Sequence, residues 1–146
     1  MILYLDTSAL VKAYVAEENS AAVMAAITAA QAVASHVIAF VEAHAAFARL
    51  YREGAIEEAA FLTIKAEFIA DWPAYLRVEM AQSLVQRAAD LAEAFALRAY
   101  DSVHLAAADF LFNQEAEPVT FACFDRRLNQ AARVLGIPIL QANPAS

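Results

Sequence analysis

Glycine is almost absent from this chain: among 146 residues there are two, Gly54 and Gly136. Phosphate-binding loops such as GxGxxG and GxxxxGK[ST] need several glycines at short fixed spacings, because the backbone has to approach the phosphates closely. Neither loop can be written with the two glycines present. The sequence therefore argues against dinucleotide-binding enzymes and P-loop nucleotide hydrolases.

Cysteine is equally scarce, since Cys123 is the only one. An internal disulfide and a cysteine-based zinc site are both excluded, and we expect Cys123 to be a small buried apolar residue of a protein in a reducing cytoplasm. The N-terminal MILYLDTSAL has no basic start, so we expect no signal peptide. The uncharged stretch from Asn19 to Val41 is rich in alanine and interrupted by polar residues. We interpret it as two elements meeting near Ser35 and expect no membrane contact.

Basic residues are also few, with 10 Lys and Arg against 17 Asp and Glu, a formal net charge of -7 and a pI of about 4.8. A general nucleic-acid-binding protein is normally basic, so any nuclease hypothesis has to explain this acidity. Hydrophobic residues make up 62% of the chain, which is enough for a sizeable core. The length favours one domain, residues 1–146.

Short apolar runs alternate with helical patterns along the chain. We expect strands at Ile2–Leu5, Ala32–Ser35, Ala74–Val78, Val119–Ala122 and Ile137–Leu140. We expect helices from Thr7 to about Val15, from Glu17 to about Ala30, and over His36–Arg52, Ile56–Asp71, Met80–Leu97, Asp101–Asn113 and Asp125–Gly136. This alternation predicts an α/β fold whose mainly parallel sheet lies between helices. The helix over Ile56–Asp71 and its neighbour could stand apart as a lobe.

Four acidic residues stand out as site candidates. Asp6 ends the first strand and Asp125 follows the strand at Val119–Ala122, and ligands of open α/β sheets bind beyond the carboxyl ends of the strands. Glu42 lies on an apolar helical stripe with no Lys or Arg three or four positions away. Asp101 begins an apolar helix. Each has a structural alternative: a turn residue for Asp6, a solvent-facing side chain for Glu42, and a helix N-cap for Asp101 and Asp125.

The combination of the four acids is more informative than any one of them. Four carboxylates gathered at one end of a sheet would repel each other strongly. A hard divalent cation such as Mg²⁺ or Mn²⁺ relieves this repulsion, because such ions take oxygen ligands. A site of that kind can activate water and neutralise a phosphodiester. We therefore hypothesise that the four acids meet in space.

Four segments in order resemble the motifs of the PIN-domain family, especially its VapC-type toxins. They are LDTSALVKAYVAEENS, SHVIAFVEAHAAFARL, ALRAYDSVHLAAA and FACFDRRLNQAARVLGI, and together they span nearly the whole chain. The resemblance implies a PIN-like three-layer α/β/α sandwich with a short-stranded, mainly parallel central sheet. It also implies a metal-dependent endoribonuclease that is the toxin of a VapBC-type toxin–antitoxin pair.

The resemblance also implies roles for individual residues. Asp6, Glu42, Asp101 and Asp125 would be catalytic and would hold one or two Mg²⁺ or Mn²⁺ ions, with Asp6 and Asp101 as the main ligands. Thr7 or Ser8 would support the first acid. Many relatives place Thr or Ser two residues before the fourth acid, and here Cys123 stands there. The implied partners are an RNA substrate, a small cognate antitoxin and a second copy of the chain in a homodimer.

Basic and histidine side chains near the motifs are harder to assign. Lys12 and Arg126 are possible RNA contacts, and the scarcity of other basic residues fits a limited RNA groove and an antitoxin with a basic segment. The three histidines, His36, His44 and His104, are expected to be packing or capping residues rather than metal ligands.

Several other functions remain open at this stage. A housekeeping RNA-processing PIN nuclease would share the same acids, and only a neighbouring gene for a small DNA-binding protein separates it from a toxin. A non-catalytic PIN-fold interaction module is disfavoured by the intact acids. A phosphatase or receiver-type protein also places Asp after its first strand. Phosphotransfer to Asp6 would favour an acid at position 8, where Ser8 stands instead.

Overall fold

A four-stranded parallel sheet forms the centre of the molecule. The computed structural model describes residues 1–114 and 117–141. The strand order is β3-β2-β1-β4, and every neighbouring pair is parallel. The strands are β1 (Ile2–Leu5), β2 (Ala32–His36), β3 (Leu76–Val78) and β4 (Val119–Ala122).

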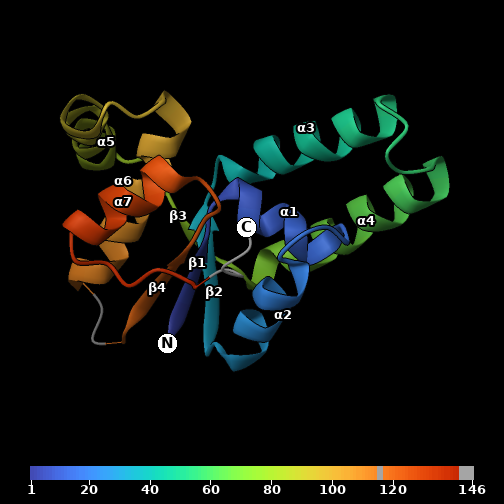
Figure 1. Ribbon diagram of the computed structural model, residues 1–146, viewed down its shortest axis with the longest axis horizontal. Coiled ribbons are helices and arrows are strands. Elements are labelled where there is room, and N and C mark those ends of the chain that lie inside the picture. The colour runs from blue at the N-terminus through green and yellow to red at the C-terminus, as the bar shows by residue number, and fades with distance from the viewer. Residues whose placement is uncertain (115–116, 142–146) are drawn as a thin grey trace.

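Helices cover both faces of this sheet, as Figure 1 shows. One side carries the first four helices and the other side carries the last three. The helices are α1 (Thr7–Tyr14), α2 (Ser20–Ala29), α3 (Ala39–Arg52), α4 (Glu58–Asp71), α5 (Gln82–Phe95), α6 (Ala99–Gln114) and α7 (Arg126–Val134), with a 3-10 turn η1 (Trp72–Ala74) before β3. The predicted three-layer α/β/α sandwich with a parallel central sheet is confirmed.

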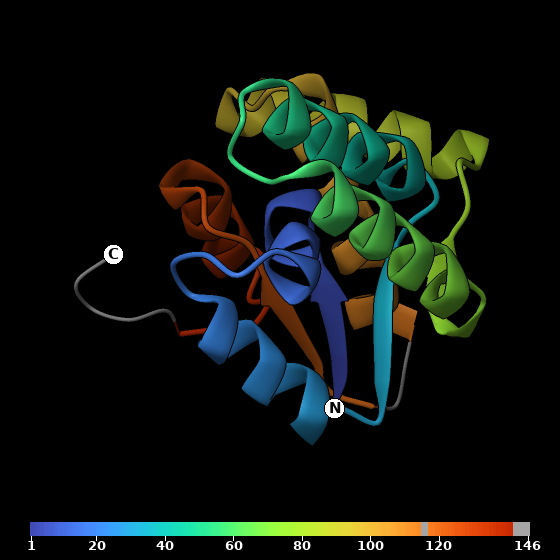
Figure 2. The ribbon, with the colours of Figure 1, turned by 90° about the vertical axis from the view of Figure 1, so that its right-hand side faces the viewer.

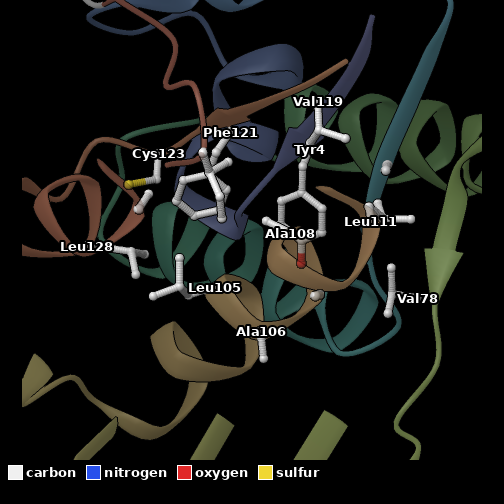
Figure 3. Packing of buried hydrophobic residues seen from close by; sticks show 14 of the residues in the cluster. Tyr4, Val78, Leu105, Ala106, Ala108, Leu111, Val119, Phe121, Cys123 and Leu128 are labelled. Atoms are coloured by element: carbon white, nitrogen blue, oxygen red, sulfur yellow. The ribbon is translucent and has the colours of Figure 1, made fainter. Parts of the chain in front are cut away.

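The side chains of β1 point alternately into two hydrophobic cores, one on each face of the sheet. Successive side chains of a strand point to opposite faces, so Ile2 and Tyr4 enter the core under α5, α6 and α7. Leu3 and Leu5 enter the core formed with α1 to α4. Tyr4 stacks on Phe121 of β4 with 5.7 Å between ring centroids, and Figure 3 shows both rings within the core under α5, α6 and α7.

The hairpin of α3 and α4 extends beyond the sheet, and the two helices run side by side in Figures 1 and 2. Gly54, with a φ of 75°, follows the end of α3 in the left-handed conformation that favours glycine. An aromatic cluster centred on the buried Phe68 ties the hairpin to the rest of the protein. The rings around Phe68 belong to Tyr14, Phe40, His44, Phe47, Trp72 and Tyr75. The two helices therefore project as a pair, as expected, but they share a core with α1 and α2 and do not stand apart from it.

The strand order also indicates where a ligand can bind. From β1 the chain crosses to β2 on one side, whereas β4 adds to β1 on the other side. A crevice opens at the carboxyl ends of strands where the order reverses in this way. Asp6 directly follows β1, and its amide donates to Ala122 O of β4 at 3.1 Å. The fold thus brings the ends of β1 and β4, and the acids that follow them, to the same edge.

Three expectations about elements were wrong. The predicted strand over Ile137–Leu140 is reduced to one isolated bridge between Phe121 and Ile139, because Pro138 has no N–H with which to extend a ladder. Helix α6 begins at Ala99, so Asp101 lies in its first turn and is not its N-cap. Helix α3 begins at Ala39, since His36 completes β2.

None of the helices in residues 1–114 and 117–141 is both long enough and apolar enough to cross a membrane. The uncharged stretch that raised this question consists of α2, β2 and the start of α3.

Candidate active site

One open cavity of about 830 Å³ lies at the carboxyl edge of the sheet, and all four predicted acids line it. They come from four separate segments: the end of β1, the first turn of α3, the first turn of α6 and the N-cap of α7. The rest of the lining is Thr7, Ser8, Val11, Lys12, Glu17, Val41, Ala45, Ala46, Arg49, Leu50, Arg52, Arg98, Tyr100 and Phe124. The structure therefore brings the four acids together.

Asp6 is the most firmly held of the four carboxylates. It is buried, caps α1, and its Oδ1 accepts hydrogen bonds from Ser8 Oγ at 2.7 Å and from the Ala9 amide at 2.9 Å. Burial raises the pKa of Asp6, an effect that the nearby Asp101 increases, although His104 and the two hydrogen bonds act in the opposite direction. Ionised Asp6 is therefore costly to the fold, as expected for a carboxylate that is kept for a ligand.

Glu42 is half-buried in the cavity and has hydrogen-bond partners, so it is not a freely solvated surface side chain. Its side chain is 24% exposed, and Oε1 accepts hydrogen bonds from Thr7 Oγ1 at 2.7 Å and from His104 Nε2 at 2.8 Å. Burial alone would raise the pKa of Glu42, but His104 and Thr7 outweigh it and the pKa is lowered. Glu42 is thus held ionised by His104 and Thr7, with no Lys or Arg partner within residues 1–114 and 117–141.

Asp101 and Asp125 lie on either side of a guanidinium group. Arg98 Nε is 3.1 Å from Asp101 Oδ2, and Arg98 Nη2 is 3.8 Å from Asp125 Oδ2. Asp125 also caps α7 by accepting from the Leu128 amide at 2.9 Å, so its N-cap role and its place in the cavity coexist. The Arg98 side chain is 82% exposed, so neither contact adds much stability.

Hydroxyl groups hold the first two acids, but a thiol stands beside the fourth. Ser8 bonds to Asp6 and Thr7 bonds to Glu42. Cys123 is buried, and its Sγ lies 3.5 Å from the Asp125 carbonyl oxygen, a weak contact with the backbone rather than with the carboxylate. Burial raises the pKa of Cys123, so it remains a neutral thiol.

His104 was missed as a site residue by sequence reasoning. It is 2% exposed and lies between Tyr4 and Glu42. The available signal was its position three residues after Asp101, which places both on one face of α6. The other two histidines bond locally, His44 to the Phe40 carbonyl and His36 to the Ile38 amide.

The basic residues are distributed differently from the prediction. Lys12 lines the cavity but bonds to Glu17 at 3.2 Å and lies over the Phe124 ring. Arg126 does not line the cavity; it borders a neighbouring hollow of about 370 Å³ together with Arg98. Sequence reasoning also missed Arg49 and Arg52, which line the cavity from α3. Their spacing of seven and ten residues from Glu42 places them on the same helical face.

The oxygen atoms that remain available define what the site can bind. Both hydrogen bonds to Asp6 fall on Oδ1 and both to Glu42 fall on Oε1, so the second oxygen of each receives no hydrogen bond from residues 1–114 or 117–141. No group of three or more His, Cys, Asp or Glu side chains within that part of the chain already converges on a metal position. The donor set, four carboxylates, is nevertheless the kind that hard divalent cations prefer.

Comparisons with known proteins were made at the level of sequence and of structure. No protein-family model matches the chain. Two curated relatives are Ribonuclease VapC45 of Mycobacterium tuberculosis (strain CDC 1551 / Oshkosh) and Ribonuclease VapC49 of M. tuberculosis (strain ATCC 25618 / H37Rv). Each is 32% identical over 142 residues, which cover 97% of this chain and 96% of the relative.

Solved structures agree on the fold. A chain of FitAB bound to an IR36 DNA fragment superposes with a TM-score of 0.68 and 16% identity, covering 95% of this chain and 93% of that one. A chain of FitAcB from Neisseria gonorrhoeae gives a TM-score of 0.64 at 16% identity, covering 97% of both chains. Because the curated relatives match over almost their whole length, this chain belongs to the VapC ribonuclease family.

Proposed function

We propose that this protein is a metal-dependent endoribonuclease and the toxin of a VapBC-type toxin–antitoxin pair. The observation that carries the proposal is the convergence of Asp6, Glu42, Asp101 and Asp125 on one cavity. They come from four distant segments of a chain related to VapC ribonucleases over nearly its full length. A purely structural role for these acids would not require them to share a solvent-accessible cavity.

The chain's own residues prepare this cavity for a phosphodiester. Ser8 and Thr7 fix the carboxylates of Asp6 and Glu42 by bonding to one oxygen of each, which leaves the other oxygen for a ligand. Arg98 stands on the rim with an exposed guanidinium, a group whose planar fork matches phosphate oxygens. RNA would therefore meet fixed acids at the bottom of the cavity and a cationic rim above them.

The donor set fits Mg²⁺ or Mn²⁺, one or two ions per site, held by Asp6 and Asp101 with Glu42 and Asp125 completing the set. Asp6 supports this assignment, because its buried carboxylate carries a raised pKa beside Asp101 and would be relieved by a cation. When bound, such an ion stabilises the charge that develops on the phosphodiester and makes water more acidic. On metal binding, the carboxylates of Asp101 and Asp125 would give up their contacts with Arg98 and bind the ion instead.

We propose RNA, a small cognate antitoxin and a second copy of the chain as partners. An antitoxin segment that enters this cavity would carry basic side chains, because carboxylates line its floor. Exposed large apolar residues such as Val41, Leu62 and Val134 support contacts with another chain. A monomer in light scattering at tens of micromolar, roughly a usual working concentration, would contradict the homodimer.

Two alternatives from within the family make different predictions. A housekeeping RNA-processing nuclease would show the same metal-dependent cleavage but would bind no neighbour-encoded antitoxin. A non-catalytic module would bind its partner and leave RNA intact. Native mass spectrometry with the protein encoded by the adjacent gene, together with an RNA cleavage assay, separates the three functions.

The test of the nuclease proposal is cleavage of single-stranded or loop RNA with Mg²⁺ or Mn²⁺. EDTA should abolish cleavage, and the products should carry 5′-phosphate and 3′-hydroxyl ends. Asp6→Asn and Asp101→Asn should each lose at least ~10²-fold in rate, because loss of a ligand removes transition-state stabilisation. The matched control is Asp90→Asn, an exposed aspartate of α5, which should keep wild-type activity.

Full activity in both cavity variants would contradict the assignment. Hydrolysis of a small phosphomonoester without RNA cleavage would favour a phosphatase instead.

A further inference from the structure

His104 links the core of the sheet to the cavity. Its ring is buried on α6, with Nδ1 2.8 Å from the Tyr4 hydroxyl of β1. Its Nε2 lies 2.8 Å from Glu42 Oε1 and 3.2 Å from Thr7 Oγ1. Residues from three other elements therefore meet at this imidazole ring, and one of them is a carboxylate that lines the cavity.

The partners determine which ring nitrogen carries the hydrogen. An ionised carboxylate only accepts hydrogen bonds, so His104 Nε2 must donate to Glu42. Thr7 has a single hydroxyl hydrogen and donates it to Glu42 Oε1 at 2.7 Å, which leaves its oxygen as a second acceptor beside Nε2. The hydrogen-bond pattern is consistent only with a protonated Nε2.

Tyr4 completes the arrangement from the other side of the ring. Burial raises the pKa of Tyr4 well above its ordinary value, and the nearby Asp6 adds to this. The hydroxyl therefore keeps its hydrogen, and its oxygen lies 2.8 Å from Nδ1. Because a hydroxyl can donate to or accept from a ring nitrogen, Tyr4 holds the ring at Nδ1 while Nε2 carries the hydrogen that Glu42 accepts.

We propose that His104 is a positioning residue of the active site: its Nε2–H holds Glu42 in one orientation, while Tyr4 holds the ring in place at Nδ1. This inference rests on the proposed nuclease function of the cavity. Because both donors bond to Oε1, the arrangement directs Oε2 of Glu42 to a cation or substrate. Residues that orient metal ligands in this way change metal affinity or activity by about 10- to 100-fold when they are lost.

The first measurement is the ring ¹⁵N NMR spectrum of His104 in the full-length protein at neutral pH. We expect a protonated Nε2. The spectrum needs neither metal nor RNA, so it tests the arrangement independently of the proposed nuclease activity. An unprotonated Nε2 would overturn the proposal.

The second measurement is Mn²⁺ affinity, titrated with the metal alone. His104→Leu should weaken binding by about 10- to 100-fold, whereas His104→Gln should stay near wild type, because its amide N–H can reach Glu42. His104→Asn carries the same amide one carbon closer to the backbone and should behave like the Leu variant. It replaces that variant if Leu does not fold, and thermal melting identifies the folded proteins.

The matched control is His44→Gln, at a histidine of α3 that lies outside the cavity lining, and it should bind Mn²⁺ like wild type. Tyr4→Phe keeps the ring that stacks on Phe121 and should weaken Mn²⁺ binding less than His104→Leu. Equal affinity in wild type, His104→Leu and His104→Asn would overturn the proposal. A wild type that binds no Mn²⁺ would instead contradict the proposed function. The NMR spectrum would then still show whether Nε2 of His104 donates to Glu42.

Discussion

His36 provides a quantitative test of the electrostatics next to the site. It ends β2 with no exposed surface, and its Nδ1 accepts a hydrogen bond from the Ile38 amide at 3.0 Å. Its Nε2 is buried and has no hydrogen-bond partner in residues 1–114 or 117–141. The pKa of His36 is lowered from 6.5 to about 4, mainly by burial and also by His104, while Glu42 partly opposes both effects. His36 is therefore neutral in the folded protein at neutral pH.

The lowered pKa makes stability depend on pH with a definite sign. Between pH 6.5 and 4 the unfolded chain protonates His36 while the folded protein does not, so the free energy of unfolding falls as the pH falls. The difference between pKa values of 6.5 and about 4, at about 1.4 kcal/mol per pH unit, corresponds to roughly 3 kcal/mol. The loss begins near pH 7 and is complete near pH 4.

The variant that isolates this effect is His36→Asn. Asn does not titrate, and its Oδ1 can accept the hydrogen bond from the Ile38 amide in place of Nδ1. The smaller side chain should cost about 1–2 kcal/mol at every pH, because it leaves a small cavity. Urea unfolding at pH steps from 7.5 to 4 should therefore show the variant less stable at neutral pH. The difference should change by about 3 kcal/mol in favour of the variant toward pH 4, so that the variant becomes the more stable protein there.

Taking the difference between the two proteins cancels the titration of the acids that both share. His44→Asn is the matched control and should keep the wild-type slope, because it leaves His36 in place. Parallel stability curves for wild type and His36→Asn across the whole range would refute the argument that burial keeps His36 neutral.

Two further changes test the site and the lobe. Asp6→Asn should melt at a higher temperature than wild type in EDTA at pH 7. Burial raises the pKa of Asp6 in the folded protein, so wild type loses stability as the pH rises through that pKa, and the variant does not. Asn can still accept from Ser8 and Ala9, and a lower melting temperature would contradict this cost of ionisation. Phe68→Ala should lose about 3–5 kcal/mol in urea unfolding, because the buried ring contacts the whole aromatic cluster. A loss below about 1 kcal/mol would show that the cluster does not stabilise the α3–α4 hairpin.

Much of the fold could be predicted because its causes are local. The strands Ile2–Leu5 and Val119–Ala122 have the predicted bounds. The first is an apolar run ended by Asp6, and the second is a short run that begins directly after Pro118. Asp125 caps α7 as its position before a helical pattern indicated. The boundaries that shifted, such as the start of α6 at Ala99, lie where no local signal marks the end of an element.

Of the cavity lining, the sequence indicated the four acids, whose order along the chain carries the resemblance to VapC proteins, and the hydroxyl of Ser8 beside Asp6. By itself the sequence determined the alternation of strands and helices, and with it the parallel sheet that places Asp6 and Asp125 at one edge. Only the tertiary structure decided what surrounds the acids. Glu42 accepts a hydrogen bond from His104, which is 62 positions away, and Arg98 contacts two acids from different segments. Such contacts depend on how the crossovers pack α3 and α6 against the sheet, and no pattern of neighbouring residues encodes that packing.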